Sequence, residues 1–352
     1  SAILDAENDF EGGDLSFAFF KENDPHKNLM QCNANMQVAY TPAESVTIPF
    51  SFYFGPNHFK TLKSYGEGYE KIVPLGGWLV GWINRWVIIP IFDFFNNSIA
   101  NYGIIILIMT LLLKLVISPL TIKSFVSSAK MKVIKPEIDK INAKYPKQED
   151  AMKKQQETMD LYKKSGISMF GGCLPMLLQF PVLFAMFRFF PASFELRQQP
   201  FLWVEDLSSY DSILELPFKI PLYGDHVSLF AILVFITMFL YSKMTYAQQG
   251  DSGQMPGMKF MTLYFMPFMM LFICNNLSSA LCYYYMLSNI ITMLMTLVIR
   301  KFFVDEKKIL AQIQKNSVKV KNKPKSKFQQ RLEEAAKAQQ EMLKQQQQQK
   351  RR

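Results

Sequence analysis

One lysine stands in the middle of an apolar run that is long enough to cross a lipid bilayer. The stretch from Ile104 to Thr121 reads IIILIMTLLLKLVISPLT, and Lys114 is its only charged residue. A cation at the bilayer centre costs roughly 2.5 to 3.5 kcal/mol on insertion scales, so its side chain should face protein or water. Thr110, Lys114 and Ser118 are four residues apart and share one helical face. This polar stripe predicts a wet groove or a buried polar partner.

Few residues could pair with Lys114 inside the membrane. Gln179 lies in a second apolar run and Ser288 and Asn289 lie in the last one, whereas the other apolar runs contain no Asp or Glu. A lysine without a carboxylate argues against a structural ion pair and against a proton relay of acidic groups. It favours a water-filled cavity in which the ammonium group meets something polar that arrives from outside. The alternative is a lysine that extends along its helix to the cytoplasmic interface.

The apolar runs and the charges between them predict a membrane protein with five spans. The chain has 352 residues, is 49% hydrophobic and has a formal net charge of +10. Segments before the first span and between the second and third are net acidic, while those between the first and second and after the last are net basic. Because short cytoplasmic loops carry the Lys/Arg excess, the N-terminal segment is expected outside and the C-terminus in the cytoplasm. The predicted spans are residues 103–121, 169–190, 227–243, 259–274 and 280–299.

The residues before the first span have a different character. Residues 1–70 alternate apolar and polar side chains between Pro, Asn and Gly clusters, which is typical of short half-buried strands. We expect them to complete a larger β-domain, with a signal or anchor helix further upstream. Within residues 71–100, Trp78, Trp82 and Trp86 recur at helical spacing, which predicts an amphipathic helix in the periplasmic membrane interface. The alternative for this segment is a sixth span.

Two segments are strongly basic. Residues 123–165 contain two stretches of helix-forming residues separated by Pro146, which predicts a cytoplasmic helical hairpin. Residues 304–352 are rich in Lys and Gln and lack the apolar residues of a core, so we expect a basic disordered tail. The charge of the tail suits ribosomal RNA, and the hairpin could serve as a docking surface for an incoming chain or a ribosome. Anionic lipid headgroups explain the same charge, and both interpretations stay open.

Enzymatic motifs are absent from the sequence. It contains no HExxH, GxSxG or Walker motif, and His26, His58 and His226 are scattered outside the spans. We therefore expect no catalytic residue, no metal site and no cofactor.

Cys274 and Cys282 flank one outer turn and are expected to be buried thiols, with a disulfide between them as the alternative. Methionines crowd the last two spans, which suits either a surface for varied apolar partners or ordinary core filling.

Several motifs together resemble a known family. They are the polar first span ending in SPLT, the basic hairpin, and the segments GGCLPMLLQFPVLFAMF, ELRQQPFLWVEDLS and YYYMLSN. Residues 75–303 carry them in the order found in the YidC/Oxa/Alb family of membrane protein insertases, and FYFGPNHFKTLKSY resembles the end of the periplasmic β-domain of Gram-negative members. The resemblance implies a membrane all-α core of five transmembrane helices with a cytoplasmic helical hairpin. It also implies that a C-terminal remnant of a periplasmic β-sandwich domain precedes this core, in the bacterial inner membrane.

The resemblance further implies a hydrophilic groove that is open to the cytoplasm and to lipid and closed on the outer side. Lys114 falls at the position of the family's groove arginine, which keeps the charge but loses the planar guanidinium and its bidentate hydrogen bonding. Family groove and client-contact positions also fall on Thr110, Gln179, Leu183, Tyr284 and Tyr285. With the polar residues identified above, the expected groove and client contacts are Lys114, Thr110, Ser118, Gln179, Leu183, Tyr284, Tyr285 and Ser288.

These features predict a membrane protein insertase and chaperone that moves nascent hydrophobic segments from the cytoplasm into the bilayer without nucleotide. Burial of the new span would supply the free energy, since each fully buried apolar side chain contributes roughly 1.5 to 3 kcal/mol. The expected partners are nascent membrane proteins and the lipid bilayer, with the ribosome and the Sec translocon as further candidates, and a monomeric core suffices. The alternatives are a small-solute transporter or channel, and a membrane anchor that only displays the outer domain.

Overall fold

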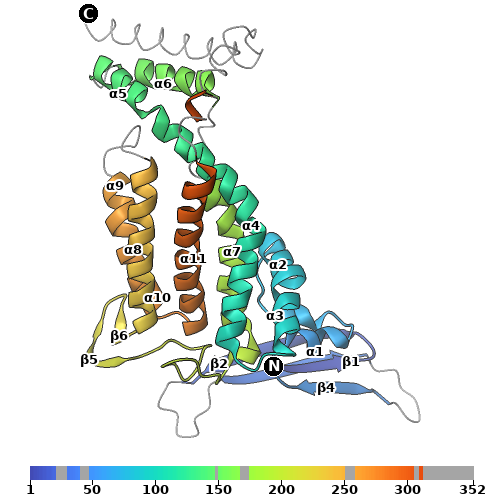
Figure 1. Cartoon of the computed structure of the whole chain (residues 1–352). Coiled ribbons are helices and arrows are strands. Elements are labelled where there is room, and N and C mark those ends of the chain that lie inside the picture. The colour runs from blue at the N-terminus through green and yellow to red at the C-terminus, as the bar shows by residue number, and fades with distance from the viewer. Residues whose placement is uncertain are drawn as a thin grey trace, which may run out of the picture. The chain divides into compact units, whose positions relative to one another are not determined.

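The computed structural model describes residues 1–20, 30–39, 47–146, 150–166, 174–249, 258–304 and 309–311 (Figure 1). Most of these residues are helical. The chain divides into two compact units, Ser1–Pro74 and Leu75–Arg352, which we call unit 1 and unit 2. Within the described ranges, every helix that is long and apolar enough to cross a membrane belongs to unit 2.

The described residues of unit 1 form two β-ribbons and two short helices. Its elements are β1 (Ala2–Ala6), β2 (Phe10–Phe19), β3 (Met30–Val38), β4 (Phe50–Phe54), α1 (Phe59–Ser64) and η1 (Tyr69–Ile72). β1 pairs antiparallel with β4 and β2 pairs antiparallel with β3. Leu15, Phe17 and Phe19 alternate along β2 and are all exposed, so one face of this ribbon presents large apolar side chains.

A helix lies at each of the predicted spans in unit 2, although the ends differ. These helices are α4 (Tyr102–Val133), α7 (Leu174–Ala192), α8 (Leu229–Gln249), α10 (Met266–Asn275) and α11 (Ser279–Phe303), and α10 follows directly on α9 (Met258–Phe260) and η5 (Met261–Phe265). α11 packs against α4, α7 and α8, while α10 packs against α8. Figure 1 shows α11 standing between α4 and α8. The central position of α11 brings its polar residues close to those of three other helices.

Helix α4 is longer than the span that the sequence predicts. It begins after Asn101, whose side-chain oxygen accepts a hydrogen bond from the Ile104 amide at 3.2 Å. It then continues past the expected boundary at residue 121 to Val133, with Pro119 inside it. A proline donates no backbone hydrogen bond, yet the helix persists around it. The predicted membrane span and the beginning of the predicted hairpin segment are therefore one continuous helix.

The tryptophan-rich segment forms a helix with a widened middle turn. Its parts are α2 (Trp78–Ile83), the π-helix η2 (Asn84–Ile88) and α3 (Ile89–Asn96). Trp78, Trp82 and Trp86 are exposed, whereas Asn84 is fully buried and donates to the Leu75 carbonyl at 2.8 Å. The tryptophans thus line the exposed side of the helix.

Length and composition identify several membrane-spanning candidates within the described residues. The long candidates are Trp78–Asn96, Tyr102–Val133, Leu229–Tyr246 and Ser279–Phe302, and Met261–Asn275 is a shorter apolar helix. Three of the long candidates and the shorter helix coincide with predicted spans. The predicted span at residues 169–190 lies partly outside the described residues. For the tryptophan-rich segment, length and composition fit a span as well as an interfacial helix.

Two helices beyond the end of α4 pack as a hairpin around a small core. α5 (Lys135–Lys144) and α6 (Ala151–Ser165) contact each other through Ile134, Ile138 and Tyr162, which are all buried. On the surface, Glu157 accepts hydrogen bonds from the Lys144 ammonium at 2.6 Å and from the Tyr145 hydroxyl at 3.0 Å. The hydrogen bond to Glu157 raises the pKa of Lys144. Nearly all of the predicted tail lies outside the described residues.

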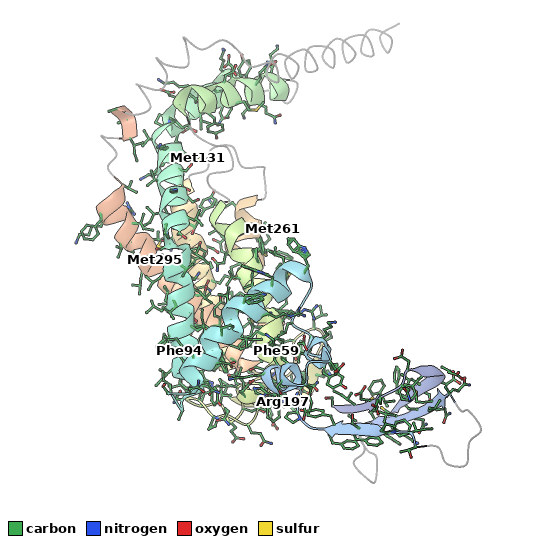
Figure 2. All side chains as sticks on the ribbon, turned by 90° about the vertical axis from the view of Figure 1, so that its right-hand side faces the viewer. Phe59, Phe94, Met131, Arg197, Met261 and Met295 are labelled. Atoms are coloured by element: carbon green, nitrogen blue, oxygen red, sulfur yellow. The ribbon has the colours of Figure 1, made fainter. Side chains whose placement is uncertain are left out.

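The connection between α7 and α8 forms a cap at the other end of unit 2. It contains η4 (Phe194–Leu196), β5 (Leu214–Ile220) and β6 (Gly224–Val227), and the two strands pair antiparallel. Figure 2 places Met131 in α4 and Arg197 in this connection at opposite ends of the helices. Helix packing thus separates the α5–α6 hairpin from the connection that contains β5 and β6.

Candidate functional site

Lys114 points into the protein and binds a hydroxyl group of another helix. Its side chain in α4 is 8% exposed, and its Nζ donates a hydrogen bond to Thr292 Oγ1 of α11 at 2.9 Å. Among the described residues no carboxylate lies within ion-pair distance of Lys114 and no other hydrogen-bond partner is present. An ammonium group has three protons. Two of them therefore remain available to a group that enters the site.

The oxygen that binds Lys114 is held in place by its own helix. Thr292 Oγ1 donates to the Ser288 carbonyl at 2.6 Å, and Thr296 Oγ1 donates to the Thr292 carbonyl at 2.7 Å. A hydroxyl has one proton, so the donation to Ser288 leaves only lone pairs for Lys114. Ser288, Thr292 and Thr296 follow at intervals of four residues and are all buried. They form a hydroxyl stripe on α11 opposite the stripe that contains Lys114.

Gln179 connects a third helix to this stripe. Its Nε2 in α7 donates to Ser288 Oγ at 3.3 Å. Lys114, Thr292, Ser288 and Gln179 therefore form a continuous polar group across α4, α11 and α7, which we call the Lys114 network. Asn289 on a neighbouring face of α11 donates to Thr237 Oγ1 of α8 at 3.4 Å. Polar side chains thus join α11 to each of the long helices around it.

The other residues on the Lys114 face of α4 are not part of this network. Thr110 is fully buried, but its hydroxyl donates to the Ile106 carbonyl of its own helix at 2.6 Å. Ser118 is half-buried, one turn beyond Lys114. The predicted stripe therefore lies on one face, with Lys114 as the member that reaches across to a neighbouring helix.

Aromatic and aliphatic residues flank the network on α7 and α11. Tyr284 lies one turn before Ser288 and is 2% exposed, and its ring centroid is 5.9 Å from that of Phe190 in α7. The rings of Tyr284 and Tyr285 are 6.1 Å apart, and Tyr285 and Leu183 are half-buried. The predicted site residues thus come from three helices. Gln179 and Ser288 bond each other directly, Lys114 joins them through Thr292, and the aromatic and aliphatic residues lie beside them.

Thr292, the partner of Lys114, was not among the residues predicted from the sequence. The stripe left a wet groove and a buried polar partner open, with the cavity favoured, and in the structure the cation has a neutral hydroxyl partner. The repeat of Ser288, Thr292 and Thr296 at helical spacing carries the signal, because it matches the spacing of Thr110, Lys114 and Ser118. Two such stripes on different helices predict a polar contact between them.

A second polar cluster, which the sequence did not reveal, organises the connection between α7 and α8. The carboxylate of Asp211 is buried and accepts hydrogen bonds from Ser228 Oγ at 2.5 Å and from the Leu229 amide at 2.8 Å, at the start of α8. It also accepts from Trp203 Nε1 at 3.1 Å. Asn275, at the end of α10, accepts from the Ser228 amide at 2.9 Å. This cluster fixes the connection to α8 by satisfying that helix's first backbone amides, and to α10 through the side chain of Asn275.

Two cysteines lie at the end of α10 and the start of α11. Cys274 and Cys282 are buried free thiols, and Cys282 Sγ donates to the Cys274 carbonyl at 3.3 Å. The alternative of a disulfide between them is therefore not formed. Among the described residues no group of three or more His, Cys, Asp or Glu side chains is placed to hold a metal ion.

Known proteins resemble this chain over much of its length. Proteins named membrane protein insertase YidC from Bacteroides fragilis and Parabacteroides distasonis are each 44% identical to it and cover 96% of it. The chain covers 56% and 54% of those two proteins, so it spans about half of their length. A structure described as an active YidC insertase with its first transmembrane domain resolved has a TM-score of 0.46 and 19% identity, over 79% of this chain and 58% of that one.

A family description matches the region that contains the Lys114 network. The family described as 60Kd inner membrane protein matches residues 94–308, which is more than half of the chain. The matched region includes three of the long apolar helices and the shorter one. The protein is therefore a multi-pass inner membrane protein and belongs to the 60Kd inner membrane protein family.

Proposed function

We propose that this protein is a membrane protein insertase that transfers nascent hydrophobic segments from the cytoplasm into the lipid bilayer without nucleotide. Its family and the names of its relatives support this proposal. The observation that carries it is Lys114, a buried intramembrane cation whose partner among the described residues is a neutral hydroxyl. Ionisable residues inside membranes are costly and generally functional.

The Lys114 network would receive the polar flank of an incoming segment. A client carbonyl or carboxylate can accept from the two available protons of Lys114 or replace Thr292 as its acceptor. The bond to Thr292 pairs the ammonium group with a neutral acceptor, whereas a client carboxylate also brings an opposite charge, whose attraction is strong where water is excluded. Exchange of the hydroxyl for an anionic client group is therefore favourable, and the flank passes the membrane without losing all of its polar contacts.

The apolar part of the client would leave sideways into lipid. Leu183 and Tyr285 are half-buried next to the polar network and provide an apolar border. Transfer of each large apolar side chain out of water contributes roughly 1.5 to 3 kcal/mol. A span of about twenty residues therefore provides the driving force, and the protein needs only to lower the barrier for the polar flank.

We infer the expected five-span topology, with the N-terminal segment outside and the hairpin and tail in the cytoplasm. The basic residues of the α5–α6 hairpin support this orientation, because the hairpin lies at the end opposite the α7–α8 connection (Figure 2). The exposed Trp78, Trp82 and Trp86 support an interfacial location for residues 71–100. The exposed apolar face of β2 supports the assignment of residues 1–70 to a larger β-domain.

The binding partners that we propose follow from the insertase function. Nascent membrane proteins are the clients, and the basic hairpin and tail are the candidate contacts for a ribosome. The Sec translocon remains a candidate partner, and the core acts as a monomer in this proposal because the Lys114 network is complete within one chain.

Reconstituted insertion of a short single-span client tests the proposed function. Wild type is compared with Lys114→Arg, Lys114→Leu and Lys114→Glu at matched protein amounts in proteoliposomes. Lys123→Leu serves as the matched control, since it removes one positive charge from an exposed position of the same helix. We expect insertion by the wild type, Lys114→Arg and the control, and loss of insertion in Lys114→Leu and Lys114→Glu.

Other results would decide against the proposal in distinct ways. Full insertion by Lys114→Leu would show that the cation is not required. No insertion by the wild type, together with saturable uptake of a small solute, would favour the transporter or channel instead.

A further inference from the structure

Strand β5 of the β5–β6 hairpin exposes large apolar side chains. Its sequence alternates apolar residues with Glu215, Pro217 and Lys219. The register of its pairing with β6 shifts between Glu215 and Ile220. Leu214 is 57% exposed and Phe218 is 62% exposed, whereas Leu216 and Ile220 are half-buried.

The tip of this hairpin exposes a leucine in an unusual backbone conformation. Leu222 has a φ of 69° and is 90% exposed. Gly or Asn is the usual residue in this left-handed region, because a side chain clashes with the backbone there. The tip therefore presents a large aliphatic side chain at a position where turn geometry favours a small or polar residue.

Contacts of the next residue place the tip beside the end of an apolar helix. The Tyr223 carbonyl accepts hydrogen bonds from the side-chain amides of Asn275 at 2.9 Å and Asn276 at 2.8 Å, at the end of α10. The Tyr223 ring also contacts Phe272, one turn inside α10, with centroids 5.4 Å apart. Figure 1 shows β5 and β6 beside the ends of α8 and α10. The tip thus lies level with the last turn of a helix that belongs to the membrane region.

We propose that the β5–β6 hairpin is a lipid anchor, with Leu222 and Phe218 inserted into the bilayer leaflet next to α10. The exposed apolar surface of α10 continues toward the tip through Phe268 and Ile273, which are 55% and 44% exposed. Lys219, the neighbour of Phe218 in β5, stays in water or at the headgroups. An amphipathic element at a membrane surface buries its apolar face in this way. The anchor requires only that α10 is in the membrane, and it depends neither on the orientation of the chain nor on the insertase activity.

Lipid accounts for this surface better than a protein partner does. The apolar side chains of the hairpin join a helix surface that already faces lipid, so the same medium covers both. A single strand and a tip residue also offer little area for a protein interface, since stable interfaces bury about 800 Å² per partner.

Spin labels at paired positions test the anchor in the full chain reconstituted into lipid nanodiscs. A nitroxide is attached to Leu222→Cys, to Phe218→Cys and, as the matched control, to Lys219→Cys. The background carries Cys32→Ser and Cys173→Ala and serves as the unlabelled blank. Oxygen concentrates among acyl chains, whereas a water-soluble nickel chelate does not. We expect oxygen to relax the labels at 222 and 218 more than the chelate does, and the ratio to reverse at 219.

Two outcomes would overturn the anchor. Stronger relaxation by the chelate than by oxygen at both 222 and 218 would place the hairpin in water. Protection from both reagents that disappears on dilution of the protein would show that a second copy covers the surface. Because the readout is position in the membrane, failure of the anchor is separate from failure of the insertase proposal, which rests on client insertion.

Discussion

Lys114 and Thr292 are 178 residues apart in the chain, yet a hydrogen bond of 2.9 Å joins them inside the helical unit. A cation in the membrane interior normally has a carboxylate or a water-filled cavity to compensate its charge. Here the partner is a single hydroxyl whose proton already serves the Ser288 carbonyl. The ammonium is therefore oriented by a neutral acceptor while most of its charge stays unneutralised. In the proposed function, this arrangement lets Lys114 bind the polar flank of a client and release it again.

Replacement of Thr292 tests the importance of that orientation. Thr292→Val keeps the shape of the side chain but removes the acceptor, so it should destabilise the protein by about 1 to 2 kcal/mol and reduce insertion. Thr292→Ser keeps the hydroxyl and should behave like the wild type. Thermal unfolding in detergent and the proteoliposome insertion assay measure the two effects. Equal results for Val and Ser would contradict a role for the hydroxyl.

A close contact at the start of α4 gives a second prediction. A Cβ on Gly103 would lie 2.2 Å from the ring of Phe201, which packs on Tyr283 with centroids 4.9 Å apart. Gly103→Ala should therefore cost about 1 to 3 kcal/mol by overpacking. Phe201→Leu in the same chain should restore part of this loss by vacating the ring position. Melting temperatures of the two single variants and the double variant test this, and simple addition of the two losses would rule out the contact.

The buried carboxylate of Asp211 should hold the α7–α8 connection in its folded conformation. Asp211→Ala removes the helix cap of α8 and leaves the Trp203 indole without its acceptor. We expect a loss of at least about 2 kcal/mol, because a lost cap and an unsatisfied buried donor each cost about 1 kcal/mol or more. Hydrogen exchange of residues 203–230 should accelerate, while that of α5 and α6 stays unchanged. Uniform acceleration in both regions would point to global destabilisation instead.

The core of the α5–α6 hairpin should be separable from the Lys114 network. Ile138→Ala creates a cavity beside Ile134 and Tyr162 and should destabilise the hairpin by about 2 to 5 kcal/mol. Hydrogen exchange should increase in α5 and α6 and remain unchanged around Thr292. Asp139→Ala is the matched control, because this neighbouring side chain is exposed. Equal effects of the two substitutions would show that the hairpin has no specific core.

Periodicity and charge predicted those parts of the fold that local patterns determine. The stripe of Thr110, Lys114 and Ser118 indicated an inward-facing polar surface, and Lys114 is indeed buried. The pairing of Lys114 with Thr292 could not be derived in the same way, because it depends on how two distant helices pack. The Asp211 cluster escaped prediction for the same reason, since Trp203, Ser228 and Asn275 belong to separate elements.

Boundaries between helices were predicted less well than the helices themselves. The apolar run that ends in SPLT indicated the end of a span near residue 121. In the structure α4 continues to Val133. Hydropathy reports where a helix leaves lipid, and it does not report where the backbone stops being helical.

Helix α4 lacks one backbone hydrogen bond, at Pro119, and is therefore easier to bend at that position. It extends for about 48 Å at 1.5 Å per residue, from the membrane region to the α5–α6 hairpin. Pro119 cannot donate to the carbonyl of Leu115, so the rod has a joint at that point, just beyond Lys114. A load on the hairpin can therefore bend the outer arm of the rod while the arm that holds Lys114 keeps its alignment with α11. We therefore expect bending at Pro119 to leave the contact between Lys114 and Thr292 aligned when the far end of α4 is displaced.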